Sequence, residues 1–253
     1  MKKLLGCLLF SFFPVSNVAA SAVQVEFDHE TIGFAEQPRV SVLLQVLNNK
    51  SKVYWPMAKL YQTDTANQAQ LLQNQRQVLE DLRQLIIIWH HDQSVSQQLS
   101  ALRREIASWQ LGVLVNTPLD LDLAKLKQEF NPVLNKGIYT LSASKRLNFV
   151  SVVAMGGRSD VVYRQGKPAY QYLAEADFSA ASKDVDEVFY IPNQTYDNTI
   201  EIKTIAVSFW NKTAEPVANG TVLFVPVPAD VLTEQYATLN EQIVQLAQYR
   251  IAQ

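Results

Sequence analysis

The sequence predicts an α+β protein, and three observations support that prediction. Short stretches with strand-like patterning occur in two regions, a helical hairpin lies between these regions, and an amphipathic helix ends the chain. Single helices mixed with short strands are typical of the α+β class. The length of 253 residues is enough for one large domain or two ordinary ones.

The first twenty residues have the composition of a secretory signal peptide. Residues 2–3 supply a positive start, residues 4–15 are almost entirely apolar, and small residues lead up to Ala20. We expect cleavage after Ala20 and a periplasmic mature protein. A lipoprotein box ending at Cys7 is the alternative, but the apolar stretch ahead of Cys7 is too short for a signal. The mature chain is therefore expected to contain no cysteine.

The region up to residue 62 predicts two strands and a helix. Apolar and polar residues alternate over residues 22–27, which indicates a half-buried strand. A helix is expected over residues 38–47, because Pro38 suits a first turn and the apolar residues that follow fall on one side. Residues 57–61 suit a further strand.

Residues 65–110 predict two antiparallel helices. Apolar residues recur every three or four positions along both halves, which places one seam on each helix. Thr65 with Gln68, and Ser94 with Gln97, fit capping boxes at the two helix starts. This pattern suits a packing hairpin. An arm that binds a partner is left open, because two helices alone make a poor core.

The region from residue 112 to residue 228 returns to short strands. A sharp turn is expected at Gly156 and Gly157, directly after a stretch of β-branched residues. The candidate strands are residues 113–115, 138–141, 149–153, 187–191, 200–207 and 221–225, and residues 168–176 suit a short helix.

The last segment, residues 229–253, predicts an amphipathic helix with Asp230 as its N-cap. Apolar residues recur at spacings of four and three, which places them on one face. This face could dock on the chain's own body or on the helix of a partner, and the sequence leaves the choice open. Its members are Leu232, Tyr236, Leu239, Ile243 and Leu246.

Composition and motifs argue against several classes of function. The net charge is -2 and no basic block occurs, so nucleic-acid binding has no electrostatic support. After the leader no apolar run is long enough for an integral membrane segment. The spacing of histidine and cysteine suits no metal site, and no glycine-rich phosphate loop or Gly-x-Ser-x-Gly elbow occurs. We therefore expect no metal, no cofactor and no catalytic residues.

Carboxylates supply the one enzymatic alternative. A sugar-modifying enzyme needs two facing carboxylates. Asp120 and Asp122 would share a face if their segment is extended, and Asp184 and Asp186 cluster ahead of a predicted strand. Solvated turns explain both groups better than a catalytic pair does.

Aromatic and basic side chains are the better candidates for a binding site. Tyrosines and a tryptophan are frequent between residues 163 and 210. Aromatic faces stack on sugar rings, and arginine pairs with acidic saccharides. The candidate polysaccharide-binding residues are Arg158, Arg164, Tyr170 and Trp210, although core packing also explains many of the rings.

Several fragments, in order along most of the chain, resemble the GfcC family of capsule-assembly proteins. Two features differ from the family pattern: Gly112 is followed by Val113 where the family often has arginine, and Arg146 is followed by Leu147 where it tends to have proline. The matching fragments are Asn131–Gly137, Tyr172–Leu173, Asp186–Ile191, Trp210–Asn211, Gly220–Pro226 and Leu239–Ile243.

The resemblance implies two tandem β-grasp-like domains and a periplasmic location. It places the first domain at residues 21–146, with the helical hairpin inserted at residues 65–110. The second domain then covers residues 147–228, and the amphipathic helix follows at residues 229–253. This layout is similar to two domains of the outer-membrane polysaccharide exporter Wza, and the resemblance implies no enzymatic activity.

The leading hypothesis is a non-enzymatic periplasmic accessory protein in the assembly or export of capsular or extracellular polysaccharide. It would bind the polysaccharide or a component of the outer-membrane export machinery. One alternative is a polysaccharide-modifying enzyme that uses Asp122, Asp184 or Asp186. Another is a structural adaptor that joins a partner through the C-terminal helix. The sugar, the partner and the oligomeric state are left open.

Overall fold

The computed structural model confirms the α+β class, with two five-stranded sheets that each mix parallel and antiparallel pairs. The predicted leader and its cleavage site after Ala20, with Cys7, lie outside the described residues. The structure describes residues 21–50, 55, 58–143, 148–178, 185–193, 201–208, 210 and 212–251, apart from the side chains of residues 50 and 65–67.

The first sheet has the strand order β2-β1-β5-β3-β4, in which β1 and β5 are parallel neighbours. Helix α1 (Val40–Lys50) contributes buried leucines to the core beneath this sheet, and α4 (Leu121–Leu126) packs beside α1. The 3₁₀ turn η2 (Gln128–Phe130) follows α4. The strands are β1 (Val23–Phe27), β2 (Glu30–Phe34), β3 (Lys59–Gln62), β4 (Val113–Leu114) and β5 (Gly137–Ser142).

The second sheet repeats this arrangement with the order β7-β6-β10-β8-β9. When strands are numbered within each sheet, both orders are 2-1-5-3-4, with the first and last strands parallel. A helix, α5 (Ala169–Glu175), again follows the first strand pair. The β-grasp assignment of the two units stays a prediction from the family resemblance. The strands are β6 (Phe149–Ala154), β7 (Gly157–Val162), β8 (Glu187–Ile191), β9 (Lys203–Ala206) and β10 (Val222–Phe224).

Strands β2 and β7 were not predicted, and a tight turn precedes each. Asp28 and His29 both have positive φ (48° and 66°), the backbone that a two-residue hairpin turn requires. Gly157 has φ 103°, where glycine carries no steric penalty, and it begins β7 directly after a turn at residues 155–156, one residue earlier than the turn predicted at Gly156 and Gly157. Both strands lie at sheet edges with many exposed residues, so their apolar pattern is weak.

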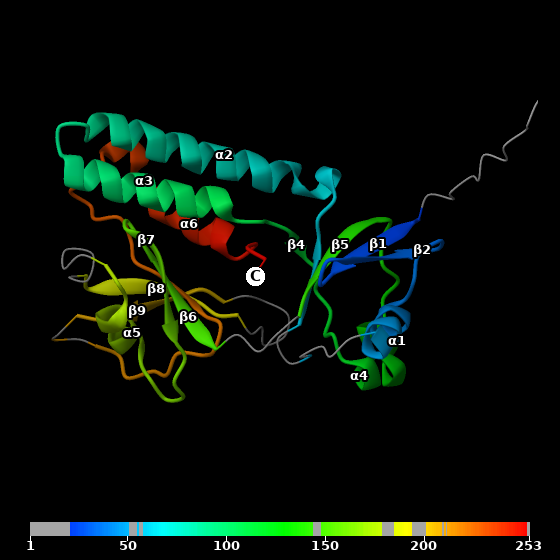
Figure 1. The fold of residues 1–253 in the computed structure, drawn as a ribbon. Coiled ribbons are helices and arrows are strands. Elements are labelled where there is room, and N and C mark those ends of the chain that lie inside the picture. Colours follow the sequence, from blue (N-terminus) through cyan, green and yellow to red (C-terminus); the bar gives the residue numbers. More distant parts are fainter. Residues whose placement is uncertain are drawn as a thin grey trace, which may run out of the picture.

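The helical hairpin is inserted between β3 and β4 of the first sheet, yet it lies across the second sheet (Figure 1). It consists of α2 (Thr65–Ile88) and α3 (Gln93–Ser108). The expected N-cap at Ser94 was wrong. Asp92 caps α3 instead, and its carboxylate accepts from the backbone N–H of Ser94 (2.9 Å) and Val95 (3.1 Å). The side chain of Thr65, proposed as the other cap, lies outside the described residues.

Two glutamines of α2 hold the base of the hairpin together. The buried Gln75 donates through Nε2 to the carbonyls of Ile106 (2.8 Å) and Trp109 (3.2 Å), which lie where α3 ends. Gln68 donates to the carbonyl of Leu111 (2.6 Å), just beyond that end. These bonds fix the chain that leaves α3 against the first half of α2.

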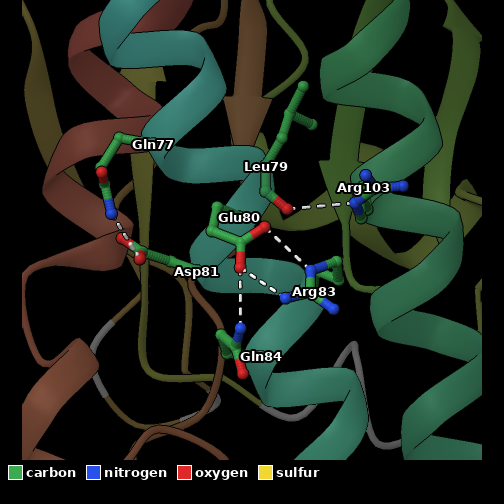
Figure 2. A network of polar contacts seen from close by, with 7 residues as sticks. All are labelled: Gln77, Leu79, Glu80, Asp81, Arg83, Gln84 and Arg103. Atoms are coloured by element: carbon green, nitrogen blue, oxygen red, sulfur yellow. Dashed lines mark hydrogen bonds and ion pairs between the residues drawn. The ribbon is translucent and has the colours of Figure 1, made fainter.

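The outer face of α2 is polar (Figure 2). Glu80 accepts from Arg83 (2.7 and 2.8 Å) and from Gln84 (2.7 Å), and Gln77 donates to Asp81 (2.8 Å). These pairs lie three or four residues apart, the spacing at which neighbours meet on a helix surface. The hairpin therefore directs its apolar seam inward and its amides and charges outward.

The C-terminal helix is shorter than predicted, and Asp230 is not its N-cap. Pro228 accepts from the backbone N–H of Val231 and begins a turn, a 3₁₀ segment η4 (Glu234–Tyr236) follows, and α6 (Leu239–Ala247) begins only after it. Asn240 ties α6 to the chain after β10 through two bonds with the Val227 backbone (2.8 and 3.0 Å).

The face offered as a partner surface is covered by the chain's own hairpin and second sheet. Its four residues from Tyr236 to Leu246 are buried in one cluster with the seam leucines of α2 and α3, and Leu232 packs against that cluster. This shared cluster also includes Val153 and Phe224 of the second sheet. Among the described helices, none combines the length and apolar character needed to span a membrane.

Candidate functional site

Two of the four predicted sugar-binding residues lie before or within α5, a third lies close in sequence to a segment that contacts α5, and the fourth lies elsewhere. Arg164 precedes α5, Tyr170 lies in its first turn, and Trp210 comes from the segment after β9. Arg158 belongs to the far end of β7, with about 13 Å of strand between it and Val162. Arg158 is therefore separate from the residues near α5.

The loop before α5 is fixed by a buried tyrosine. The Tyr172 hydroxyl accepts from the backbone N–H of Arg164 (2.9 Å) and donates to the carbonyl of the same residue (3.1 Å). Burial raises the pKa of Tyr172, so the hydroxyl keeps its proton at neutral pH. This pair of bonds holds the Arg164 backbone while its side chain remains 69 % exposed.

A buried lysine lies beneath this surface. Lys167 has a side chain only 5 % exposed, and its Nζ contacts Glu175 Oε2 (2.5 Å) and lies 4.2 Å from the centre of the Tyr172 ring. The hydrogen bond from Lys167 lowers the pKa of Glu175. Arg164 lies 3.8 Å from the other oxygen of Glu175. Two cations therefore converge on one carboxylate.

Sequence reasoning missed Lys167 and Glu175. They lie eight residues apart and belong to no recognised motif. The one available signal is that Lys167 directly precedes Pro168 and the predicted helix, a position where packing against the helix could be expected.

Tyr170 is joined to the segment that carries Trp210. Pro168 forms an isolated bridge with Pro216, and the Val217 N–H donates to the Lys167 carbonyl (3.0 Å), so residues 212–217 lie beside the start of α5. Lys212 Nζ lies 4.8 Å from the centre of the Tyr170 ring, a cation–π distance.

Trp210 precedes this contact by two residues and is 91 % exposed. Phe209 and Asn211 beside it lie outside the described residues. We name Arg164, Tyr170, Trp210 and Lys212 the α5 surface. An exposed indole and a phenol ring can stack on sugar rings, and cationic side chains can pair with acidic substituents.

The proposed carboxylate pair at Asp120 and Asp122 was wrong in its geometry. Their segment is not extended: Asp120 is the N-cap of α4 and accepts from the N–H of Asp122 (2.9 Å) and of Leu123 (3.0 Å). Asp186 precedes β8 in the other sheet, and Asp184 lies outside the described residues. Over the described ranges, no three His, Cys, Asp or Glu side chains are grouped so that they could hold a metal ion.

These features define a class: a two-unit α+β protein whose first unit carries a helical insertion that covers the second. Residues 19–146 match the family model described as capsule biosynthesis GfcC, N-terminal, and residues 157–252 match the model described as capsule biosynthesis GfcC C-terminal. The chain belongs to the GfcC family. The resemblance noted in the sequence is thereby confirmed, and the family assignment gives the chain a role in capsule biosynthesis.

Proposed function

We propose that this protein is a non-enzymatic periplasmic accessory factor that binds polysaccharide, through the α5 surface, during capsule assembly or export. The observations that support the proposal most directly are the contact of Lys212 with the Tyr170 ring in the first turn of α5, the contact of Arg164 with Glu175 at the end of the same helix, and the exposed Trp210 two residues before Lys212. Its periplasmic location rests on the leader-like composition of residues 1–20. An outer-membrane export component is the second partner compatible with the family role.

Contacts of the alternative residues favour binding over catalysis. The Asp120 carboxylate is engaged by two backbone N–H groups at the start of α4. Asp122 lies in α4 of the first unit, whereas Asp186 precedes β8 of the second, so the two belong to different units. If catalysis is absent, the variants Asp122→Asn, Asp184→Asn and Asp186→Asn should each retain full capsule production.

The adaptor alternative is weakened by the covering of the helix face. Tyr236, Leu239 and Ile243 already contact the chain's own hairpin cluster. A partner that used this face would first have to displace α2 and α3. The proposal therefore assigns binding to the α5 surface and a packing role to α6.

A complementation experiment tests the proposed function. Deleting the gene should reduce surface polysaccharide, and the wild-type gene should restore it. Trp210→Ala and Tyr170→Ala should fail to restore it, because the stacking surface is lost while the core beneath α5 is retained. Leu126→Ala is the matched control: Leu126 is 80 % exposed but lies in the first unit. Cell fractionation locates each variant, and unchanged capsule in the deletion strain or in both aromatic variants would reject the proposal.

A further inference from the structure

A second group of cationic side chains lies away from the α5 surface, where the end of the chain meets the base of the hairpin. Leu111 and Arg250 form an antiparallel bridge, and the Gly112 N–H donates to the Tyr249 carbonyl (3.0 Å). The Tyr61 hydroxyl donates to the Arg250 carbonyl (3.4 Å). These bonds fix the Arg250 backbone beside β3 of the first sheet.

The Arg250 side chain extends over Trp109, with its guanidinium carbon 5.9 Å from the ring centre. Trp109 is held in turn, because its Nε1 donates to Glu105 Oε1 (2.9 Å). No hydrogen bond or ion pair reaches the Arg250 guanidinium from the residues that the structure describes. A guanidinium offers five N–H donors, and donors withdrawn from water without partners are costly.

Arg158 approaches this junction from the second sheet. It pairs in register with Val153, whose side chain belongs to the cluster beneath the hairpin, so Arg158 lies on the hairpin face of the sheet. Its Nε contacts Asp160 Oδ1 (2.7 Å), and the same oxygen accepts from Ser151 (2.8 Å). The side chain of Arg158 keeps 25 % of its surface exposed.

The two arginines interact with each other. Burial lowers the pKa of Arg250, and the positive charge of Arg158 lowers it further, while Glu105 and Asp160 oppose this effect. Two guanidinium groups that repel each other are both stabilised when one anion binds to both. The guanidinium of Arg250 has N–H donors left for such an anion within the described residues, whereas the Nε of Arg158 already donates to Asp160.

We propose that Arg158 and Arg250, which we name the arginine junction, bind the carboxylate of an acidic sugar residue in the polysaccharide. The inference rests on the proposed function and adds a second binding position and a substrate class. A planar guanidinium pairs with a carboxylate through two parallel hydrogen bonds, and a neutral sugar offers no such partner. The α5 surface would hold the chain by stacking, and the arginine junction would select for negative charge.

Binding by the purified mature protein tests the inference. The acidic probe is a tetrasaccharide of alternating glucuronate and N-acetylglucosamine, and the matched neutral probe is chitotetraose. Inorganic phosphate serves as a competitor that shares the negative charge of the acidic probe but not its sugar rings. We expect calorimetry to show that the acidic probe binds more tightly than chitotetraose, with an affinity for the acidic probe that falls as salt rises.

Variants separate the two binding positions. Arg250→Gln and Arg158→Gln should each weaken binding of the acidic probe about tenfold or more, as expected for a lost charge-assisted hydrogen bond. Arg250→Lys keeps the charge but loses the fork, and it should bind with intermediate affinity. Arg104→Gln is the matched control, because Arg104 is an exposed arginine on the same helix as Glu105. Circular dichroism checks that each variant folds. If Arg250→Gln does not fold, the single variants Arg158→Gln and Arg250→Lys provide the test.

Each outcome decides the inference. Equal affinity of the wild type and Arg250→Gln overturns it, as does failure of the wild type to bind the acidic probe. If phosphate displaces the acidic probe as readily as free glucuronate does, the arginine junction binds any anion, and the assignment to an acidic sugar is overturned. If Trp210→Ala loses the acidic probe while Arg158→Gln and Arg250→Gln keep it, the proposed function stands and the arginine junction fails. If the junction variants alone lose the probe, the inference stands and the α5 surface fails.

Discussion

The two sheets have the same strand order but are covered differently. In the first sheet, β1 buries Val23, Val25 and Phe27 against α1, while Gln24 and Glu26 lie on the opposite face. In the second sheet both faces of β6 are buried. Residues 150, 152 and 154 pack in the cluster with α5, and residues 153 and 155 pack in the cluster with the hairpin and α6.

The matching positions of the last strands show the same difference. In the first sheet, Thr140 of β5 pairs in register with Glu26. In the second sheet, Phe224 of β10 pairs with Val153, and its ring stacks on Phe189 with centres 6.2 Å apart. A shared topology therefore does not fix which faces are apolar. The second sheet depends on helices supplied from outside its own strands, including a hairpin that belongs to the first unit.

Removing the hairpin should have the largest effect on the stability of the second sheet. Gln62 and Val113 are register partners in β3 and β4, so an Asn-Gly turn can replace residues 63–112. The second sheet and α6 would then expose the apolar face that the hairpin covers. Each fully buried leucine that the hairpin loses, such as Leu82 or Leu102, contributes about 1.5–3 kcal/mol, and a domain is stable by only about 5–15 kcal/mol. The second unit should therefore lose its cooperative fold.

Hydrogen exchange read peptide by peptide measures this outcome. We expect amides of β6, β8 and β10 to lose protection in the deletion variant, while those of β1 and β5 keep it. The control is an insertion of Gly-Ser-Gly between His90 and His91 at the hairpin tip, which leaves both packing faces intact. Full protection of the second sheet after the deletion would show that the hairpin is not a required cover.

A matched pair of leucines sharpens the same comparison. Leu43 of α1 and Leu102 of α3 are both fully buried, the first beneath the first sheet and the second in the cluster shared by the hairpin and second sheet. Leu43→Ala and Leu102→Ala should each reduce the free energy of unfolding by about 2–5 kcal/mol. Loss of protection should fall on the first sheet for Leu43→Ala and on the second sheet for Leu102→Ala. Leu126→Ala, at an exposed position, should change stability by less than about 0.5 kcal/mol. Identical exchange patterns in both core variants would contradict two separate cores.

Most elements could be predicted from periodicity, but their partners could not. The seam of the hairpin marks buried residues such as Leu82 and Leu99, yet periodicity does not say that a sheet from another unit lies against them. At the C-terminus the spacing of four and three predicted one continuous helix, and this prediction was wrong. Leu232 reaches the core from a turn and Tyr236 from a 3₁₀ segment. Spacing records which side chains are buried and leaves the backbone between them undetermined.

The residues of the candidate site could be predicted in part, but the contacts between them could not. Composition marked Tyr170 and Trp210 as candidates, and the bridge between Pro168 and Pro216 then joined their segments. No sequence pattern places Arg158 with Arg250, because the residues belong to β7 and to the chain end after α6. Contacts between elements distant in the sequence arise from the packing of the units.

The pH dependence of stability that Lys59 causes tests how well the polar face of the first sheet is hydrated. It lies in β3 on the face opposite the core and is half-buried, and burial lowers its pKa to about 8. Between pH 8 and 10.5 the unfolded chain binds this proton and the folded chain does not, so stability should rise with pH across that window. The free energy of unfolding should increase by about 2 kcal/mol from pH 7 to pH 9.5.

Lys59→Met should remove this rise and stabilise the protein at pH 7. Lys125→Met, at an exposed lysine of α4 in the same unit, is the control and should keep the wild-type profile. Urea titrations should stop at pH 9.5, because burial raises the pKa of Tyr61 and the folded state therefore loses stability once unfolded tyrosine ionises near pH 10. A flat wild-type profile would show that Lys59 is well hydrated on this face.

The smallest effect is expected on the outer face of the hairpin, where Figure 2 shows Glu80 between two donors. Hydrogen bonds from Arg83 and Gln84 lower the pKa of Glu80 to about 2. A carboxyl with a lowered pKa stabilises the fold above its unfolded value, and this contribution is lost as pH falls from about 4.5 towards 2. Glu80→Gln should remove that acid-dependent step and lower neutral-pH stability by the same small amount, since exposed ion pairs contribute little. Asp81→Asn, one residue further along the same face, is the matched comparison in acid titrations followed by circular dichroism. A large loss of stability at pH 7 in Glu80→Gln would mean that the outer face of the hairpin, like its inner face, carries packing that the second sheet depends on.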